Sequence, residues 1–254
     1  MSTPIILHIR RQQRADSPSY WQDFELQYQP GYNVVSALMA VRDNPVTIDG
    51  ERVDPPAWEY NCMEEVCGAC SMVINGRPRQ ACSALIDELR KETGNTAPIT
   101  LEPLSKFPLV RDLMVDRSRI FEGLKKVKAW VEIDGAWDVH ERAPRVSPKQ
   151  WEECYLFSRC MSCGCCMEAC PQFGPDKAFV GAAVLGQVRL KNSHPTGQYD
   201  KAERLHAIMS EGGLSDCGNA QNCARVCPKD IPLTSAIGGL GREVTAQLFK
   251  DLLG

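Results

Sequence analysis

Cysteines in the first half of the chain have the spacing of iron–sulfur cluster ligands. The segment CMEEVCGAC, with one more cysteine downstream, has the C-x4-C-x2-C pattern of plant-type [2Fe–2S] ferredoxins. Soft thiolates suit such clusters, whereas the alternative, a structural zinc site, favours paired C-x2-C knuckles and fits this spacing poorly. The sequence therefore predicts a [2Fe–2S] centre whose ligands are Cys62, Cys67, Cys70 and Cys82.

Two further cysteine runs lie in the second half of the chain. CMSCGCCMEACP has the C-x2-C-x2-C-x3-C-P spacing of bacterial ferredoxins, and CGNAQNCARVCP repeats it with Ala220 at the second cysteine position. In two-cluster ferredoxins, the cysteine before the proline binds the cluster of the other run. This rule predicts a [4Fe–4S] centre with the ligands Cys160, Cys163, Cys166 and Cys227. It leaves three thiolates, which suit a [3Fe–4S] cluster, at Cys170, Cys217 and Cys223.

Small and rigid residues accompany these cysteines. Gly68 lets the backbone curl so that amides can point at the cluster sulfur atoms, an arrangement expected to raise the reduction potential. Pro171 and Pro228 end the second and third runs, because proline prevents the local turn from continuing as a helix.

Other residues with chemical potential are interpreted as structural. Cys154 and Cys165 lie outside the ligand spacing and are expected to be packed thiols. The acidic pairs Glu64-Glu65 and Glu152-Glu153 accompany no nucleophile and no substrate pocket. Histidines that are scattered along the chain, without the pattern of a Rieske centre, are expected to be surface or hydrogen-bonding residues; they are His8, His140, His194 and His206.

Composition indicates a redox protein of two domains without a membrane span. The length of 254 residues is near the point where a single core divides, and 43% hydrophobic residues can form real cores. No apolar run is long enough to cross a membrane, and no secretory signal is recognisable, so a reducing compartment is expected. Thirteen cysteines there indicate metal binding rather than disulfides. A net charge of −3 gives no reason to expect nucleic acid as a partner.

Apolar patterns predict an α+β protein that begins with a β-grasp domain over residues 1–105. Alternating side chains predict strands near 5–9 and from Phe24 to Tyr28, and an Asn75-Gly76 turn predicts a hairpin. A helix capped by Asn33 is expected over 34–41, and a closing strand is expected at 99–103.

An all-α domain that resembles bacterial ferredoxins is predicted over residues 106–254. Apolar residues recur there at spacings of three and four, and an amphipathic helix is expected over 242–254. The helical pattern rests on Val110, Leu113, Met114, Ile120, Phe121, Leu124 and Val127. The chain lacks a glycine-rich phosphate loop and a dinucleotide fingerprint, so any flavin must belong to another protein.

These segments together resemble the iron–sulfur subunits of succinate dehydrogenase and fumarate reductase. The resemblance covers nearly the whole chain, including EPLSKFPLVRDLMVDRS and GPDKAFVGAA between the cysteine runs. It implies a flavoprotein partner with covalently bound FAD, which oxidises succinate to fumarate, and a membrane-anchor subunit at which quinone is reduced. Electrons would pass from flavin through [2Fe–2S], [4Fe–4S] and [3Fe–4S] clusters to quinone or to a haem-bearing anchor. The expected location is the cytoplasmic face of the bacterial cell membrane, where the anchor subunit holds the chain.

Two departures from the ubiquinone-reducing members of this family concern the quinone site. Those members carry a tryptophan pair after the second run and a histidine after the first cysteine of the third run. This chain has PQFGPDK and Gly218 instead, a form that resembles the bacterial group with a dihaem cytochrome b anchor. Menaquinone is therefore the hypothesis for the acceptor. The alternatives are a quinol:fumarate reductase with the same motifs and, more weakly, a free-standing multi-cluster ferredoxin, which would hardly need three centres.

Overall fold

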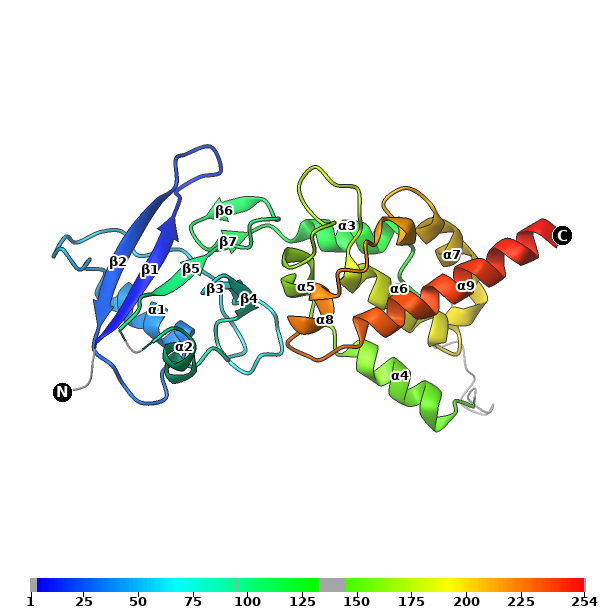
Figure 1. Ribbon diagram of the computed structural model, residues 1–254, viewed down its shortest axis with the longest axis horizontal. Coiled ribbons are helices and arrows are strands. Elements are labelled where there is room, and N and C mark those ends of the chain that lie inside the picture. Colours follow the sequence, from blue (N-terminus) through cyan, green and yellow to red (C-terminus); the bar gives the residue numbers. More distant parts are fainter. Residues whose placement is uncertain (1–3, 95, 133–144, 254) are drawn as a thin grey trace. The chain divides into compact units, whose positions relative to one another are not determined.

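The chain divides into two compact units, as the computed structural model in Figure 1 shows. The first unit comprises Met1–Arg117 and Cys163–Glu168, and the second comprises Ser118–Ser162 and Ala169–Gly254. The predicted domain boundary after residue 105 stays a prediction. The compact units themselves divide after Arg117. The residues that the structure describes are 4–94, 96–132 and 145–253.

One mixed sheet forms the frame of the first unit. Its strands are β1 (Ile5–Arg11), β2 (Tyr20–Leu26), β3 (Ser71–Ile74), β4 (Arg77–Gln80) and β5 (Ile99–Glu102). Their order is β2-β1-β5-β3-β4, in which β1 and β5 are parallel and the other neighbours are antiparallel. Strands predicted near the start of the chain and at 99–103 are confirmed, and the sheet sets the first cysteine group beside β3 and β4.

The register of the first two strands explains why the second one lies earlier than its apolar pattern predicts. Alternation in β1 buries Ile5, Leu7 and Ile9, because successive strand residues face opposite sides of a sheet. Leu26 pairs with Ile5, the first residue of β1, so β2 has no partner beyond Leu26. Tyr28, predicted to lie in the strand, instead packs against the core just outside it.

The predicted helix after the first two strands is confirmed as α1 (Val34–Asp43). Its cap residue Asn33 accepts a hydrogen bond from the Ser36 amide at 2.8 Å, which satisfies a free donor of the first turn. The same side chain donates to the Cys82 carbonyl at 2.8 Å. The start of α1 therefore also fixes the backbone at a predicted cluster ligand. A second helix, α2 (Ile86–Thr93), follows.

The Asn75-Gly76 turn joins β3 and β4 as predicted. Both turn residues adopt the left-handed conformation, with φ of 48° and 73°, which this type of hairpin turn requires. The Asn75 side chain also accepts a hydrogen bond from the Thr100 amide of β5 at 2.9 Å. The turn thus brings Cys70, which precedes β3, next to Cys82, which follows β4.

The helical prediction for residues 109–115 is wrong. Strands β6 (Leu109–Arg111) and β7 (Met114–Val115) form a small antiparallel hairpin there, within the first unit. Asp112 turns the chain in a left-handed conformation, φ 48°, and its buried carboxylate accepts from the amides of Gln12 and Ala57 and from the Arg11 side chain. These tertiary hydrogen bonds outweigh a local apolar spacing that suits a helix.

The second unit is helical, as predicted. Its longer helices are α3 (Ser118–Lys126), α4 (Pro148–Ser158), α6 (Ala182–Ser193), α7 (Lys201–Met209) and α9 (Leu233–Leu253). Helix α6 is buried along most of its length and contacts the other four. The short elements are α8 (Asn222–Arg225), η1 (Gly197–Asp200) and η2 (Leu214–Asp216); α5 (Cys165–Glu168) belongs to the first unit.

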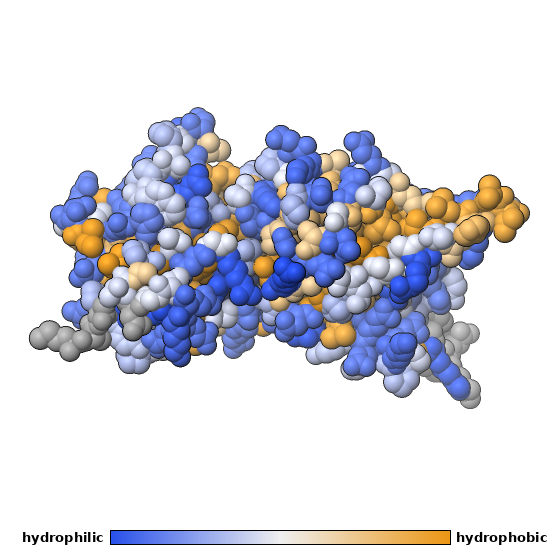
Figure 2. Space-filling model, viewed as in Figure 1, coloured by the Kyte–Doolittle hydropathy of each residue, from blue (hydrophilic) through white to orange (hydrophobic). Residues whose placement is uncertain are grey.

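The predicted C-terminal helix is the end of α9, which begins earlier than expected, at Leu233. Apolar side chains gather at its C-terminal end, as the hydropathy colouring in Figure 2 shows. The exposed ones are Leu248, Phe249, Leu252 and Leu253. Among the described residues, no helix has the length and apolar character that crossing a membrane requires.

Candidate metal centres

The first cysteine loop turns its backbone amides toward the sulfur of Cys62. The amides of Glu64, Val66 and Cys67 donate to Cys62 Sγ at 3.5, 3.3 and 3.3 Å. The Ala69 amide donates to Cys67 Sγ at 3.4 Å. Such amides stabilise negative charge on sulfur, so the loop suits thiolates that bind iron.

Left-handed backbone conformations produce this curl. Gly68 has φ of 73°, the left-handed conformation that its predicted role requires. Met63 and Glu65 also have positive φ, 60° and 54°, although neither is a glycine. No sequence signal predicts these two, because residues with a side chain rarely adopt this conformation.

The four cysteines of the first group have unlike electrostatic surroundings. Three backbone N–H groups lower the pKa of the Cys62 thiol to about 6, so it is mainly thiolate at neutral pH. Burial raises the pKa of Cys70 to about 12, although a hydrogen bond from the Cys82 backbone N–H opposes this effect. The Ala81 amide donates to the Cys70 carbonyl at 3.1 Å, which keeps Cys70 and Cys82 together at the end of the β3–β4 hairpin. The geometry fits a cluster with one pair of ligands on the loop and one pair on the hairpin.

Cysteines of the second run belong to both units. Cys163 and Cys166 lie in the first unit at α5, whereas Cys160 follows α4 and Cys227 follows α8 in the second unit. Cys165 is completely buried in the first unit, as expected for a packed thiol. Its hydrogen bond to Cys163 is the largest cause that lowers the pKa of Cys163, to about 7.

The three cysteines predicted for the [3Fe–4S] centre come together within the second unit. Burial raises the pKa of Cys223, and the nearby charges of Cys170 and Cys217 raise it further. Ala220 lies exposed between them in the chain. Three thiolates without a fourth partner at Ala220 fit a three-iron cluster better than a four-iron one.

Local hydrogen bonds hold the segments of this three-cysteine set. The Asn222 side chain donates to the Ala169 carbonyl at 3.0 Å and so joins the third run to the end of the second. A side chain added at Gly218 would begin 2.7 Å from the amide nitrogen of Gln172. A residue other than glycine at position 218 would therefore require the flexible Gln172 side chain to move.

Residues interpreted as structural have structural contacts. Burial raises the pKa of the half-buried Cys154. His8 stacks on Trp21, and His206 bonds Asp251 at 2.8 Å; His140 lies outside the described residues. Among the residues that the structure describes, no three His, Cys, Asp or Glu side chains are placed to hold a single metal ion.

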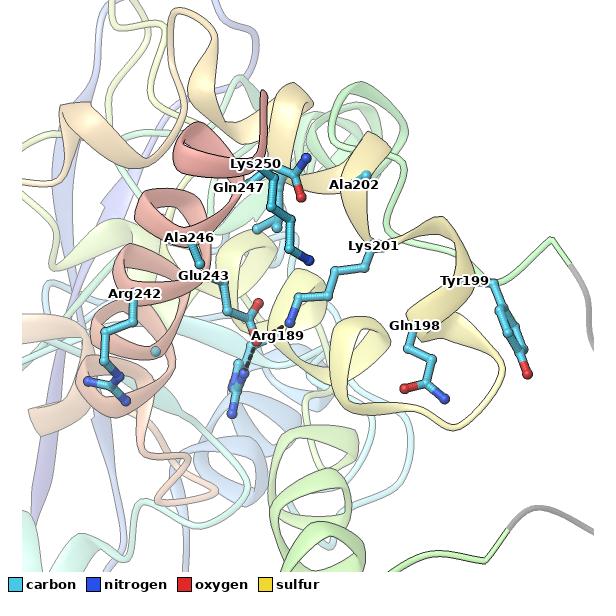
Figure 3. A pocket seen from close by; sticks show the side chains of 12 residues that line it. Arg189, Gln198, Tyr199, Lys201, Ala202, Arg242, Glu243, Ala246, Gln247 and Lys250 are labelled. Atoms are coloured by element: carbon cyan, nitrogen blue, oxygen red, sulfur yellow. Dashed lines mark hydrogen bonds and ion pairs between the residues drawn. The ribbon is translucent and has the colours of Figure 1, made fainter. Parts of the chain in front are cut away.

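A pocket of about 440 Å³ on the second unit has no cysteine in its wall (Figure 3). It lies between α6, η1, α7 and α9, and its lining includes the basic residues Arg189, Lys201, Arg242 and Lys250. Glu243 bonds Arg189 on one side and Lys201, at 2.9 Å, on the other. The polar groups here connect helices, and the pocket offers none of the ligands that an iron–sulfur cluster needs.

Two domain families match the chain. A family described as a 2Fe-2S iron-sulfur cluster binding domain matches residues 6–122, which include the first cysteine group. A family described as a 4Fe-4S dicluster domain matches residues 156–231, which include the second and third runs. The predicted succession of a plant-type and a bacterial-type ferredoxin domain is confirmed at this level.

Similar proteins extend over nearly the full chain. The succinate dehydrogenase iron-sulfur subunit of Bacillus subtilis (strain 168) is 54% identical over 246 residues, which cover 97% of this chain and 94% of that protein. The fumarate reductase iron-sulfur subunit of Wolinella succinogenes is 30% identical over 92% of this chain and 93% of its own. A chain of the Mycobacterium smegmatis Sdh1 complex in the apo form shares the fold, with a TM-score of 0.82 at 22% identity, covering 98% of each chain.

Proposed function

We propose ligand sets, partners and an electron acceptor for this chain, which belongs to the family of iron–sulfur subunits of succinate dehydrogenase and fumarate reductase. It is an electron-transfer subunit of a succinate:quinone oxidoreductase and carries [2Fe–2S], [4Fe–4S] and [3Fe–4S] clusters. The observation that carries this conclusion is the 54% identity to a succinate dehydrogenase subunit over 97% of the chain. Succinate and FAD are assigned to a partner, since this chain supplies electron carriers rather than a substrate site.

The proposed ligands follow the cysteine spacing. The [2Fe–2S] cluster is bound by Cys62, Cys67, Cys70 and Cys82. The [4Fe–4S] cluster is bound by Cys160, Cys163, Cys166 and Cys227. The [3Fe–4S] cluster is bound by Cys170, Cys217 and Cys223, and the exposed Ala220 supports the absence of a fourth ligand. When bound, the clusters supply one-electron carriers, and the chain positions them and adjusts their potentials.

The proposed partners are an FAD-containing flavoprotein and a membrane-anchor cytochrome b subunit with haem. Membership of the family supports both, because relatives of this chain are subunits of larger enzymes. No described helix could cross a membrane. We propose that the anchor subunit holds this chain at the membrane surface. We assign it to the cytoplasmic face of the bacterial cell membrane.

Menaquinone is the proposed acceptor. The chain has Gly218, not histidine, in the third run. It also has no tryptophan pair after the second run. The purified complex should therefore reduce menaquinone analogues with succinate much faster than ubiquinone analogues, and efficient reduction of ubiquinone analogues alone would exclude this acceptor.

Succinate oxidation is the proposed physiological direction. The relative with the higher identity among those named is a succinate dehydrogenase subunit, whereas the fumarate reductase subunit of Wolinella succinogenes is 30% identical. The same electron path serves a quinol:fumarate reductase, which is the second candidate. Rates of the purified complex with succinate and quinone, compared with rates with fumarate and quinol, decide between the two.

Low-temperature EPR of the purified complex, with iron and sulfide analysis, tests the three centres. We expect a [3Fe–4S] signal in the oxidised complex and [2Fe–2S] and [4Fe–4S] signals on stepwise reduction. Zinc in place of iron, or two [4Fe–4S] clusters without a three-iron centre, would contradict the ligand sets.

A further inference from the structure

A buried glutamine contacts cysteine sulfur atoms of the first and second groups. Gln80 ends β4 and is completely buried in the first unit. Its Oε1 lies 3.6 Å from Cys70 Sγ, and its Nε2 lies 3.5 Å from Cys165 Sγ. The Nε2 group also donates to Ser71 Oγ at 2.8 Å. One side-chain amide therefore contacts a proposed [2Fe–2S] ligand and the segment Cys163–Glu168.

The end of the Gln80 amide that faces Cys70 depends on the proton of Cys70. A protonated thiol donates to Oε1, whereas a thiolate bound to iron has no proton and can only accept. The oxygen and nitrogen of a glutamine side chain exchange places by a half-turn with almost no change in shape. After that half-turn, an N–H group of Gln80 points at the Cys70 sulfur.

The oxygen of Gln80 also has a donor in this second orientation. The Ser71 hydroxyl both donates and accepts, so it can donate to the glutamine oxygen. The Ser71 hydroxyl now donates to the Gly68 carbonyl at 2.7 Å. If it turns to Gln80, that carbonyl keeps its hydrogen bond from the Arg117 side chain. After the exchange each end of the amide has a partner, Cys70 at the nitrogen and Ser71 at the oxygen.

We propose that, in the cluster-loaded chain, the side-chain amide of Gln80 donates an N–H hydrogen bond to the Cys70 sulfur and raises the reduction potential of the [2Fe–2S] centre. The inference rests on the proposed function, in which Cys70 binds that cluster. A hydrogen bond to sulfur stabilises the additional negative charge of the reduced form. Gln80 is thus a positioning residue, and Ser71 holds its other end.

Pulsed EPR on the intact complex tests the hydrogen bond directly. The complex is prepared with 15N in the glutamine side-chain amides, and the reduced [2Fe–2S] signal is recorded. We expect a 15N coupling in the unmodified complex and its loss in Gln80→Leu. A normal [2Fe–2S] signal without any 15N coupling would overturn this inference alone, whereas absence of the [2Fe–2S] signal would contradict the proposed function.

The midpoint potential gives a second measurement. Removal of the N–H donor in Gln80→Leu should lower the ratio of reduced to oxidised [2Fe–2S] centre about tenfold at a fixed potential. This change corresponds to a fall of about 59 mV in the midpoint potential of the one-electron centre. Gln80→Met, of similar length, serves if the leucine variant does not assemble. Gln27→Leu is the matched control, because it makes the same change at an exposed glutamine of the first unit. An unchanged potential in an assembled Gln80 variant would refute the proposal.

Discussion

Single residues decide how the cysteine sulfur atoms are presented. In the first loop, three amides surround Cys62 because Met63 and Glu65 adopt left-handed conformations. In the third run, Asn219 and Gln221 adopt the same conformation on either side of Ala220, with φ of 51° and 61°. Both loops therefore curl without a glycine at these positions, a feature that accompanies functional sites where the surrounding structure fixes the backbone.

The proposed absence of a fourth ligand at Ala220 leads to a prediction at this scale. Ala220→Cys should add a thiolate beside the three-cysteine set and favour a [4Fe–4S] cluster, with a lower potential, in place of [3Fe–4S]. EPR of the oxidised complex should then lose its three-iron signal. Ser210→Cys, which adds an exposed thiol elsewhere in the second unit, is the control and should leave the signal intact. A persistent three-iron signal in Ala220→Cys would disprove the alignment of the two runs.

At the scale of elements, a buried ion pair holds the β6–β7 hairpin against β1. Asp112 and Arg11 are both buried and lie 3.0 Å apart, and Asp112 also accepts two backbone amides. Asp112→Ala should lower the free energy of unfolding by about 3–5 kcal/mol, because it leaves a buried charge unpaired. Urea unfolding of the full chain measures this loss.

The exposed pair of Arg79 and Glu92 provides the comparison for Asp112. A guanidinium nitrogen of Arg79 lies 3.0 Å from a carboxylate oxygen of Glu92, but the Glu92 side chain is 45% exposed. Glu92→Ala should therefore cost no more than about 1 kcal/mol. Equal losses for Glu92→Ala and Asp112→Ala would contradict the role given to burial.

A second set of polar contacts joins the helices of the second unit. Arg189 on α6 bonds Glu153 on α4 and Glu243 on α9, and Glu243 also accepts from Asn192 at 2.8 Å. Asn192 in turn accepts from the buried Arg204 of α7 at 2.8 Å. Since α6 contacts all of these helices, the network joins them to the unit's central helix.

Glu243 is the residue on which this network depends. Glu243→Ala should destabilise the chain by about 2–4 kcal/mol, because it removes one carboxylate from two cations and an amide. The apparent melting temperature of the complex measures the effect. Lys250→Ala, at an exposed residue of the same pocket wall, is the control and should have little effect. Identical melting temperatures for both variants would show that the network contributes nothing.

At the scale of the whole molecule, the centres act in series, so loss of the last one should separate two activities. Cys223→Ala should remove the [3Fe–4S] centre and abolish reduction of quinone. Succinate oxidation with an artificial dye should survive, because electrons still leave the flavin upstream. Parallel assays of both acceptors on the assembled complex test this. Equal loss of both activities with intact flavin would contradict the serial order.

The sequence by itself determined the chemistry and the class of fold. Cluster ligation depends on residue type and close spacing along the chain, both of which the cysteine runs display directly. The α+β class also followed, because alternation in β1 and the capped start of α1 are local patterns. Likewise, the Asn75-Gly76 turn needed no information from distant residues.

Only the tertiary structure decided features that depend on distant partners. Residues 109–115 have an apolar spacing that suits a helix, yet Asp112 bonds groups about a hundred positions earlier and a hairpin forms. The division after Arg117 and the placement of 163–168 in the first unit are equally invisible in local patterns. Gln80 gave no sequence signal either, because its contacts with Cys70 and Cys165 arise only when strand and cysteine runs meet. Local periodicity reflects only the conformational preferences of neighbouring residues. Burial and long-range hydrogen bonds determine which of the locally possible structures forms.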